Sequence, residues 1–244
     1  MRIHRRRYSR ALREVSCPSW EGFRNRLLAY AALPREVRDT YVFRGQPDSL
    51  WGLESSIDRQ FATMPPMERE ARLRRLLRDF EAELLGIDTA EAPNRITDRL
   101  ELLGRHHLLP TTLLDWTRSP YVAAYFAYEI QLNPLPERVA VWVFDRKALL
   151  RIEQGNAPAV DVIDDVKLLM ANTRAIEQRA VSIRAPVGVP LEELLGKGLT
   201  KFTIPSADRR LALVDLDGML ITARSLFRDR DGAARTAMIR ESIR

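Results

Sequence analysis

Hydrophobic residues along the 244-residue chain occur both in short continuous runs and in longer stretches of helical spacing. The runs at 41–43 and 138–145 are rich in β-branched and aromatic residues, which favour strands. The second run is apolar on both faces and is therefore expected in the middle of a sheet. Pro205 ends a third run of this kind. The pattern predicts a small central β-sheet with strands near 40–45, 138–145 and 200–205.

Helical spacing is clearest at 65–86, where leucine and phenylalanine side chains form a single stripe. Ser119 and Pro120 predict the start of another helix, since serine caps helix N-termini and proline is tolerated in a first turn. That helix is apolar on nearly every face and is expected to be buried. Helices outnumber the widely separated strands, which predicts a single α+β domain with helices around the sheet. The other helices are expected at 20–33, 94–105, 160–180, 190–199, 209–220 and 232–243.

The composition is typical of a soluble globular protein, with 45% apolar and 30% charged residues. The longest uncharged run, 119–128, is shorter than the roughly 20 residues that a membrane span needs, so no membrane contact is expected. With one cysteine, Cys17, the chain has no internal disulfide. This cysteine and three histidines make a structural metal site unexpected. The prediction is a cytoplasmic protein without a metal ion.

Residues 1–15 form a basic arm that lacks the apolar core of a secretory signal. The net charge of the chain is +6, and part of that excess lies in this arm. The arm is either a solvated terminus or a segment that adds salt-dependent affinity for nucleic acid. Residues 16–244 are expected to form the folded domain.

The tetrapeptide FRGQ ends the first predicted strand and contains two candidate ligand-binding side chains, Arg44 and Gln46. A guanidinium at a strand end can bind a phosphate or carboxylate through two parallel hydrogen bonds. Gln46 offers both a donor and an acceptor, and Gly45 lets a ligand or another backbone come close. Spacing alone leaves a second interpretation open, in which Arg44 is structural and pairs with a buried carboxylate such as Asp115.

His106 and His107 follow the helix predicted at 94–105. Adjacent helical residues point about 100° apart, so the two rings are not expected to bind one metal ion. One ring is a candidate proton carrier or hydrogen-bond donor to a ligand. Alternatively, the imidazoles only complement the negative end of the helix.

Asp115 lies between Leu114 and Trp116 in the segment TTLLDWT. A carboxylate in such an apolar setting must be paired or hydrogen-bonded to stay charged. It either accepts hydrogen bonds from the backbone of the following turn or acts directly on a ligand or proton.

The segment NTRAIEQ, 172–178, contains further polar groups. Arg174 and Gln178 share a face if this segment is helical, because they are four residues apart. The spacing alone does not mark a site here. The chain also has no phosphate-binding loop, dinucleotide fingerprint, nucleophile elbow or zinc motif.

Taken together, these motifs resemble the FRG domain family, which is named for its Phe-Arg-Gly motif. The resemblance covers about 40–235, and its most specific part is LLDWT followed by a helix that contains YFA. The segments that carry it, in order, are FRGQ, LWGLESSIDR, HHLLPTTLLDWTRSPYVAAYFA, NTRAIEQ, and KFTIP with LFRDRDGAA.

His106 matches the histidine of the family pattern Gln-His-Tyr-Gly. The chain departs from the family at Arg105, Leu108 and Thr112, where the pattern has glutamine, glycine and arginine. In the later pattern Asn-x-Arg-x-x-x-Gln-x-Gly-x-Phe, the chain keeps Asn172, Arg174 and Gln178 but not the glycine and the phenylalanine.

The layout of FRG domains is similar to that of ADP-ribosyltransferase-like domains, and this analogy implies NAD as a ligand. It implies that Arg44 holds the NAD pyrophosphate or ribose. Thr111, Asp115 and Thr117 are then on the nicotinamide side. Glu177 or Gln178 corresponds to the glutamate or glutamine that ADP-ribosyltransferase-like domains have late in the chain, which we call the late position. The candidate catalytic residues are His106, Asp115, Glu177 and Gln178, and the candidate ligand-binding residues are Arg44, Gln46, Thr111, Thr117, Asn172 and Arg174.

Three classes of function follow from these patterns. The resemblance implies a bacterial NAD-consuming enzyme, an ADP-ribosyltransferase or NAD glycohydrolase, that acts as a toxin or in phage defence. The positive charge and the arginine-rich helix at 65–86 indicate instead a non-catalytic module that binds a nucleotide or nucleic acid. The third class is a regulatory protein in a toxin–antitoxin-type system, whose partner the sequence does not name.

Overall fold

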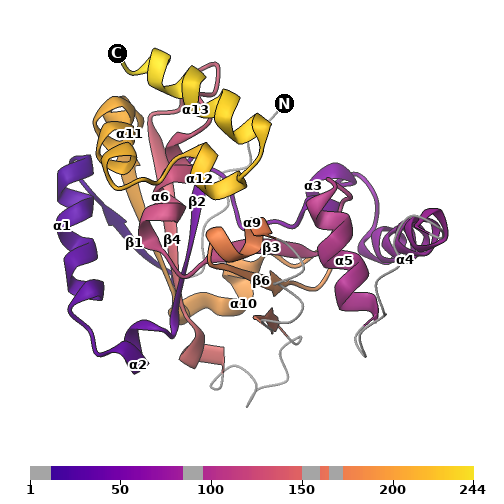
Figure 1. Cartoon of the computed structure of the whole chain (residues 1–244). Coiled ribbons are helices and arrows are strands. Elements are labelled where there is room, and N and C mark those ends of the chain that lie inside the picture. Colours follow the sequence, from indigo (N-terminus) through magenta and orange to yellow (C-terminus); the bar gives the residue numbers. More distant parts are fainter. Residues whose placement is uncertain (1–11, 85–95, 150–159, 165–172) are drawn as a thin grey trace.

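The computed structural model describes residues 12–84, 96–149, 160–164 and 173–244. Helices surround a seven-stranded sheet, so the predicted α+β class is confirmed (Figure 1). The strands are β1 (Arg13–Ser16), β2 (Tyr41–Gln46), β3 (Leu113–Thr117), β4 (Arg138–Asp145), β5 (Asp161–Ile163), β6 (Ala180–Arg184) and β7 (Leu199–Pro205). The helices are α1 (Trp20–Ala31), α2 (Arg35–Arg38), α3 (Ser56–Gln60), α4 (Pro66–Glu83), α5 (Ile96–His106), α6 (Pro120–Tyr128), α9 (Thr173–Glu177), α10 (Leu191–Leu195), α11 (Arg209–Gly218), α12 (Ala223–Phe227) and α13 (Arg230–Ser242).

The strand order in the sheet is β1-β7-β4-β2-β3-β6-β5. β1 runs parallel to β7, and the other neighbouring pairs are antiparallel. The three strands predicted from the sequence are β2, β4 and β7, which lie next to one another. β4 lies between the other two and is buried on both faces, as its apolar run predicts.

Part of the predicted pattern was wrong. The helix expected at 160–180 is replaced by the strand β5, the short helix α9 and the start of β6, while 165–172 lies outside the described residues. The sequence also gave no signal for β1 or β3. Since β1 begins at Arg13, the end of the predicted basic arm belongs to the sheet. Residues 1–11 are outside the described part, so the nucleic-acid role of the arm stays a prediction.

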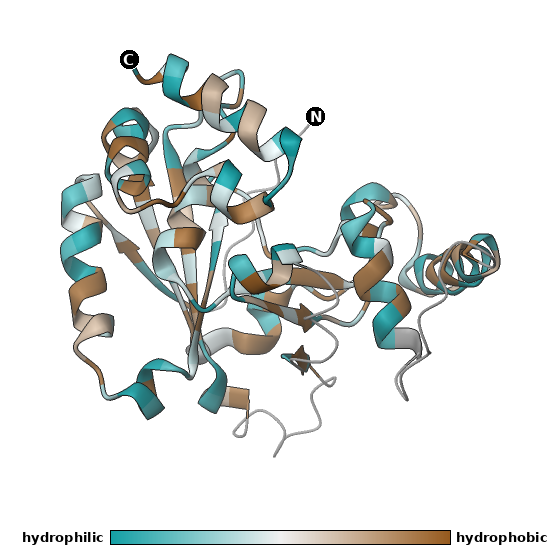
Figure 2. Ribbon diagram, viewed as in Figure 1, coloured by the Kyte–Doolittle hydropathy of each residue, from teal (hydrophilic) through white to brown (hydrophobic). Residues whose placement is uncertain are grey.

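Two apolar cores lie on opposite faces of the sheet. One is formed by strand residues such as Phe43 and Val141 with the inner faces of α1, α6, α11 and α12. The other contains Trp142 and Trp116 and is covered in part by α10. Figure 2 shows brown, apolar residues along the central strands and more teal on the outer turns of α4. The long helix α4 lies with α3 and α5 beside β3, at the right in Figure 1.

Gly45 allows α6 to lie directly on β2. A Cβ atom at this position would be 1.8 Å from the Ala123 carbonyl oxygen and 2.7 Å from the Ala127 backbone nitrogen. The predicted close approach at Gly45 is therefore that of another backbone. The start of α6 is as predicted, since the Ser119 side chain accepts a hydrogen bond from the Val122 N–H and Pro120 opens the helix.

The sheet divides between β2 and β3. Within the described residues, a single pair, Phe43 with Thr117, joins these two strands. By contrast, all six residues of β2 pair with β4, and all five of β3 pair with β6. We call the gap that opens beyond the Phe43–Thr117 pair the fork. It separates a four-stranded half, β1-β7-β4-β2, from a three-stranded half, β3-β6-β5.

A partly buried ion network fixes α5 to the three-stranded half. The Arg184 guanidinium on β6 donates to Asp98 at 2.7 Å, to Asp161 at 2.9 Å and to Glu101 at 2.9 and 3.0 Å. Glu101, whose side chain is 3% exposed, also accepts a hydrogen bond from the Thr112 N–H at 2.8 Å. Because α5 ends in Arg105 and His106, this network positions both side chains.

In the ranges that the structure covers, no helix is both long and apolar enough to cross a membrane. The same ranges contain no group of three or more His, Cys, Asp or Glu side chains arranged to hold a metal ion.

Candidate functional site

A cavity of about 900 Å³ opens at the fork, between the two halves of the sheet. Its walls come from β2, β3 and β6, from α5 and α6, and from α9 and α12. Among the residues that line it are Arg44, Arg99, Arg105, His106, Asp115, Trp116, Thr117, Phe126, Glu129, Arg174, Gln178 and Phe227. The cavity therefore brings together the three sequence motifs FRGQ, LLDWT and NTRAIEQ.

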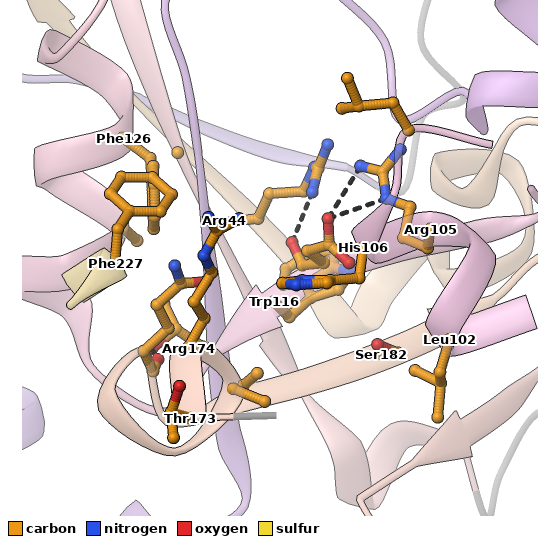
Figure 3. A pocket seen from close by; sticks show the side chains of 18 of the residues that line it. Arg44, Leu102, Arg105, His106, Trp116, Phe126, Thr173, Arg174, Ser182 and Phe227 are labelled. Atoms are coloured by element: carbon orange, nitrogen blue, oxygen red, sulfur yellow. Dashed lines mark hydrogen bonds and ion pairs between the residues drawn. The ribbon is translucent and has the colours of Figure 1, made fainter. Parts of the chain in front are cut away.

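Arg44 and Arg105 meet at Asp115 on the two sides of the fork (Figure 3). Arg44 Nη1 donates to the backbone carbonyl oxygen of Asp115. Arg105 Nε and Nη2 donate to Asp115 Oδ2 at 3.0 and 2.8 Å. The predicted proximity of Arg44 and Asp115 is thus present, but the carboxylate pairs with Arg105 because Arg44 reaches only the main chain of β3. The Arg44 side chain thus bridges β2 and β3 where the two strands no longer pair through their backbones.

The environment of Arg44 is unfavourable for a cation. Burial lowers the pKa of Arg44 to about 10, and the nearby charges of Arg105 and Arg59 act in the same direction, while Asp115 opposes them. The Arg44 Nε atom is buried without a hydrogen-bond partner in the described ranges. Burial and the Arg105 charge also lower the pKa of Arg59, which lies on α3. The fork is therefore rich in positive charge.

The opposite part of the cavity wall is aromatic. Phe126 of α6 and Phe227 of α12 make an edge-to-face contact, with ring centroids 6.2 Å apart. The guanidinium carbon of Arg174 lies 5.4 Å from the Phe227 centroid, and Arg174 also pairs with Asp229. Figure 3 shows Phe126 and Phe227 on one side of Arg44 and Arg105 on the other. The site thus combines a cationic part with an aromatic part.

Glu129 is a second carboxylate in the cavity wall, just after α6. Its side chain is 8% exposed and lies 3.4 Å from Arg235 Nη1 of α13. Burial raises the pKa of Glu129, and the Arg235 guanidinium opposes this effect. Carboxylates whose pKa is shifted by burial are frequent at functional sites.

His106 lines the cavity, as does Trp116 (Figure 3). Its ring lies 4.9 Å from that of His107, measured between centroids, in an edge-to-face arrangement. Burial lowers the pKa of His106, followed by the positive charges of Arg174 and His107, while Asp229 acts in the opposite direction. The His106 imidazole is therefore expected to be uncharged at neutral pH.

This shift predicts a loss of stability on acidification. The folded protein holds the His106 pKa below its ordinary value of 6.5, so the unfolded chain takes up the proton first as the pH falls. Stability should be maintained above pH 6.5 and decrease below it. In melting curves across this range, His106→Asn should flatten the decrease, whereas the control His107→Asn, at the more exposed ring, should not. Equal slopes for wild type and His106→Asn would contradict the assignment.

The structure places four other predicted residues around the cavity edge or away from it. Thr117 and Gln178 line the cavity, where the Thr117 hydroxyl donates to the Gln178 carbonyl oxygen at 2.6 Å. Gln46 instead binds Trp142 Nε1 and the Gly52 carbonyl in the core. Thr111 is fully buried, away from the cavity lining.

Of the two residues predicted for the late glutamate or glutamine, Gln178 lines the cavity. Glu177, its neighbour, does not line the cavity and pairs with Arg228 at 3.1 Å. Asn172 lies outside the described residues. Arg174, the third polar residue of this segment, is part of the cavity wall.

The three departures from the family pattern have distinct structural contacts. Arg105 places a guanidinium beside Asp115, and Thr112 binds Glu101. Leu108 keeps a left-handed backbone, with φ of 68°, at the position of the family glycine, and its side chain at the cavity wall is 91% exposed. Left-handed backbone is costly for leucine, which is consistent with glycine at this position in the family.

Sequence reasoning did not identify Glu129, Phe126 or Phe227 as site residues. Glu129 follows a buried helix as its first charged residue, which is a signal that could have been used. The two phenylalanines are far apart in sequence, and only the packing of α12 against α9 brings Phe227 to the cavity.

Comparison with family models gives a match over part of the chain. Residues 39–134 match the family model of the FRG domain. Neither the curated proteins nor the solved structures contain a match to this chain. The matched range includes FRGQ and LLDWT and ends before α9, so NTRAIEQ lies beyond it. The chain therefore carries an FRG domain, whose matched part supplies the Arg44, Arg105 and Asp115 side of the cavity.

Proposed function

We propose that the cavity binds a nucleotide that carries phosphate groups, with NAD as the first candidate, and that the protein consumes NAD. The observation that carries this proposal is the pairing of a cationic fork with an aromatic wall in one cavity of about 900 Å³. Guanidinium groups bind phosphate oxygens, and aromatic rings contact bases or nicotinamide. The volume is within the usual range of small-ligand sites, about 300–1,000 Å³.

The proposed reaction breaks the bond between nicotinamide and ribose. The bonding electrons leave with nicotinamide, and water or another acceptor adds to the ribosyl carbon and releases a proton. The transition state carries positive charge on the ribose, which a nearby carboxylate stabilises. Of the two carboxylates that the described residues contribute to the cavity wall, Glu129 is the more buried, with 8% of its side chain exposed against 51% for Asp115, so we assign this role to Glu129. Gln178 and Thr117 are assigned to positioning the sugar.

A nucleic-acid module is less well supported by charge. The arginine-rich helix α4 carries five arginines, but also five acidic residues, so 5 − 5 leaves no net charge. The cavity, with its four arginines, is the more cationic feature among the described residues. From the family resemblance alone, we place the proposed activity in a bacterial toxin or phage-defence system.

The test is nicotinamide release from NAD by the purified protein, followed by chromatography. Glu129→Gln should reduce the rate by about 10²- to 10³-fold, the usual effect of removing one electrostatic contact to a transition state. The increase in melting temperature caused by NAD should persist in this variant, because phosphate and ring contacts remain. Glu193→Gln, an exposed carboxylate on α10, is the matched control and should behave as wild type.

The outcomes separate the parts of the proposal. An NAD-induced shift without nicotinamide release in the wild type would leave a non-catalytic nucleotide-binding module. The absence of both would overturn the proposal. A loss of activity in Glu177→Gln but not in Glu129→Gln would return the late position to Glu177.

A further inference from the structure

Within the described residues, the two arginines at the fork that line the cavity meet one carboxylate there, that of Asp115. Three guanidiniums, those of Arg44, Arg59 and Arg105, interact electrostatically with one another and with Asp115. Arg59 has acidic neighbours of its own in Glu54 and Asp58. Arg44 and Arg105, which line the cavity, both contact Asp115, and the part of the chain that the structure describes gives them no second shared carboxylate. An anionic ligand group would therefore be attracted to this point.

The contact between Asp115 and Arg105 uses only part of the hydrogen-bonding capacity of the two side chains. Arg105 directs both Nε and Nη2 at the same oxygen, Oδ2. The strongest guanidinium–carboxylate and guanidinium–phosphate pairs have two parallel hydrogen bonds to two oxygens. The Asp115 side chain is also 51% exposed, so it is free to rotate into solvent. Ion pairs with one partner this exposed to solvent are weaker than buried pairs.

Arg44 is held in place independently of the Asp115 carboxylate. Its Nη1 donates to the main-chain oxygen, which stays in position when the side chain rotates. A guanidinium has five N–H donors, so further donors remain beyond this one contact. Arg44 comes from β2 in the four-stranded half of the sheet, and Arg105 comes from α5, which the Arg184 network fixes to the three-stranded half. The two side chains converge at the fork (Figure 3).

We propose that the fork is a phosphate subsite, in which Arg44 and Arg105 bind the phosphate or pyrophosphate of the ligand and Asp115 is an internal competitor. In the free protein, Asp115 holds Arg105 toward the cavity. A ligand phosphate replaces the carboxylate, and Asp115 turns to solvent. The choice of phosphate as the anion rests on the proposed nucleotide function. This arrangement makes Asp115 a positioning residue and not a catalytic one.

The proposal predicts the sign of a substitution. Asp115→Asn removes the competing charge and its repulsion of the ligand, so inorganic pyrophosphate should bind about three- to tenfold more tightly. If Asp115 contacted the ligand directly, as an acceptor from a sugar hydroxyl, the same change would not strengthen pyrophosphate binding. Arg105→Gln should weaken binding by about tenfold or more, because it removes a charge-assisted contact.

The experiment is calorimetric titration of the full chain with inorganic pyrophosphate at low and at physiological salt. Arg78→Gln is the control for net charge, because Arg78 is exposed on α4 and does not line the cavity. It should leave the affinity unchanged within about twofold. Circular dichroism and melting temperatures establish that each variant is folded. Arg105→Lys is a second variant, which keeps the charge but loses the two-donor geometry and should bind between wild type and Arg105→Gln.

Tighter pyrophosphate binding by Asp115→Asn, with weaker binding by Arg105→Gln, supports the subsite. Unchanged or weaker binding by a folded Asp115→Asn overturns it, and so does an absence of pyrophosphate binding by the wild type at millimolar concentration. The result is independent of NAD chemistry. If pyrophosphate binds as predicted but no nicotinamide is released, the subsite is supported and the proposed enzyme activity is contradicted. If nicotinamide is released but the variants do not change pyrophosphate binding as predicted, the enzyme activity is supported and the subsite is contradicted.

Discussion

Replacing Gly45 with alanine is expected to lower the free energy of unfolding by about 3 kcal/mol or more. The added methyl group would lie 1.8 Å from the Ala123 carbonyl oxygen and 2.7 Å from the Ala127 nitrogen. Overpacking a core costs typically 1–3 kcal/mol when side chains can move aside. Here the obstacle is helix backbone, so α6 itself has to shift away from β2. For a chain of this length, the melting temperature should fall by about 6–12 °C.

Gly218→Ala is the matched control for this substitution. Gly218 is the last residue of α11, and a Cβ atom there has no neighbour within 4 Å. Alanine is a better helix former than glycine, so this change should be neutral or stabilise by up to about 1 kcal/mol. Thermal and urea denaturation of both variants give the comparison. Similar stabilities for Gly45→Ala and wild type would show that α6 does not pack on β2 as described.

The substitution Arg184→Met is expected to cost about 3–5 kcal/mol, because it removes the guanidinium that neutralises two buried carboxylates. Glu101 and Asp98, with side chains 3% and 10% exposed, would both lose their contact to the guanidinium. Methionine retains most of the volume, so the loss reports on charge and not on packing. Since the network positions α5, pyrophosphate binding through Arg105 should weaken as well.

The control is Arg240→Met on α13. Arg240 binds Asp217 through two nitrogens, yet the two side chains are 56% and 33% exposed. Exposed pairs contribute about 0–1 kcal/mol, so this variant should differ little from wild type in urea denaturation. If Arg184→Met lowers the free energy of unfolding by less than about 1 kcal/mol, water hydrates the carboxylates in place of the guanidinium.

The sequence predicted the strands that have a strong local signal. β2, β4 and β7 are rich in β-branched and aromatic residues, and their pattern matches a buried sheet. β3 was not recognised, because Asp115 interrupts a short apolar run that threonines bound on both sides. β6 is short, and pairing with β3 and β5 defines it more than its own composition does. Such strands depend on tertiary neighbours that no local pattern contains.

The candidate site was predicted as a set of motifs, but not as a set of contacts. The cavity brings together Arg44, His106 and Asp115, which the motifs had indicated. The partner of the Asp115 carboxylate could not be predicted, because it depends on the rotation of α5 relative to β3. A residue in a strand can be contacted by a neighbour through its side chain or through its main chain. Sequence spacing does not show which of the two a neighbouring arginine reaches.

The fork gives this sheet an internal edge. At the outer rim of a sheet, an unpaired strand is a template on which a second chain can add and begin aggregation. Beyond Phe43, in the described part of the chain, the side of β2 that faces β3 lacks ladder partners in the same way. This side lines the cavity and not the outer rim. The protein thus keeps unpaired strand backbone within reach of a small ligand while hiding it from neighbouring chains.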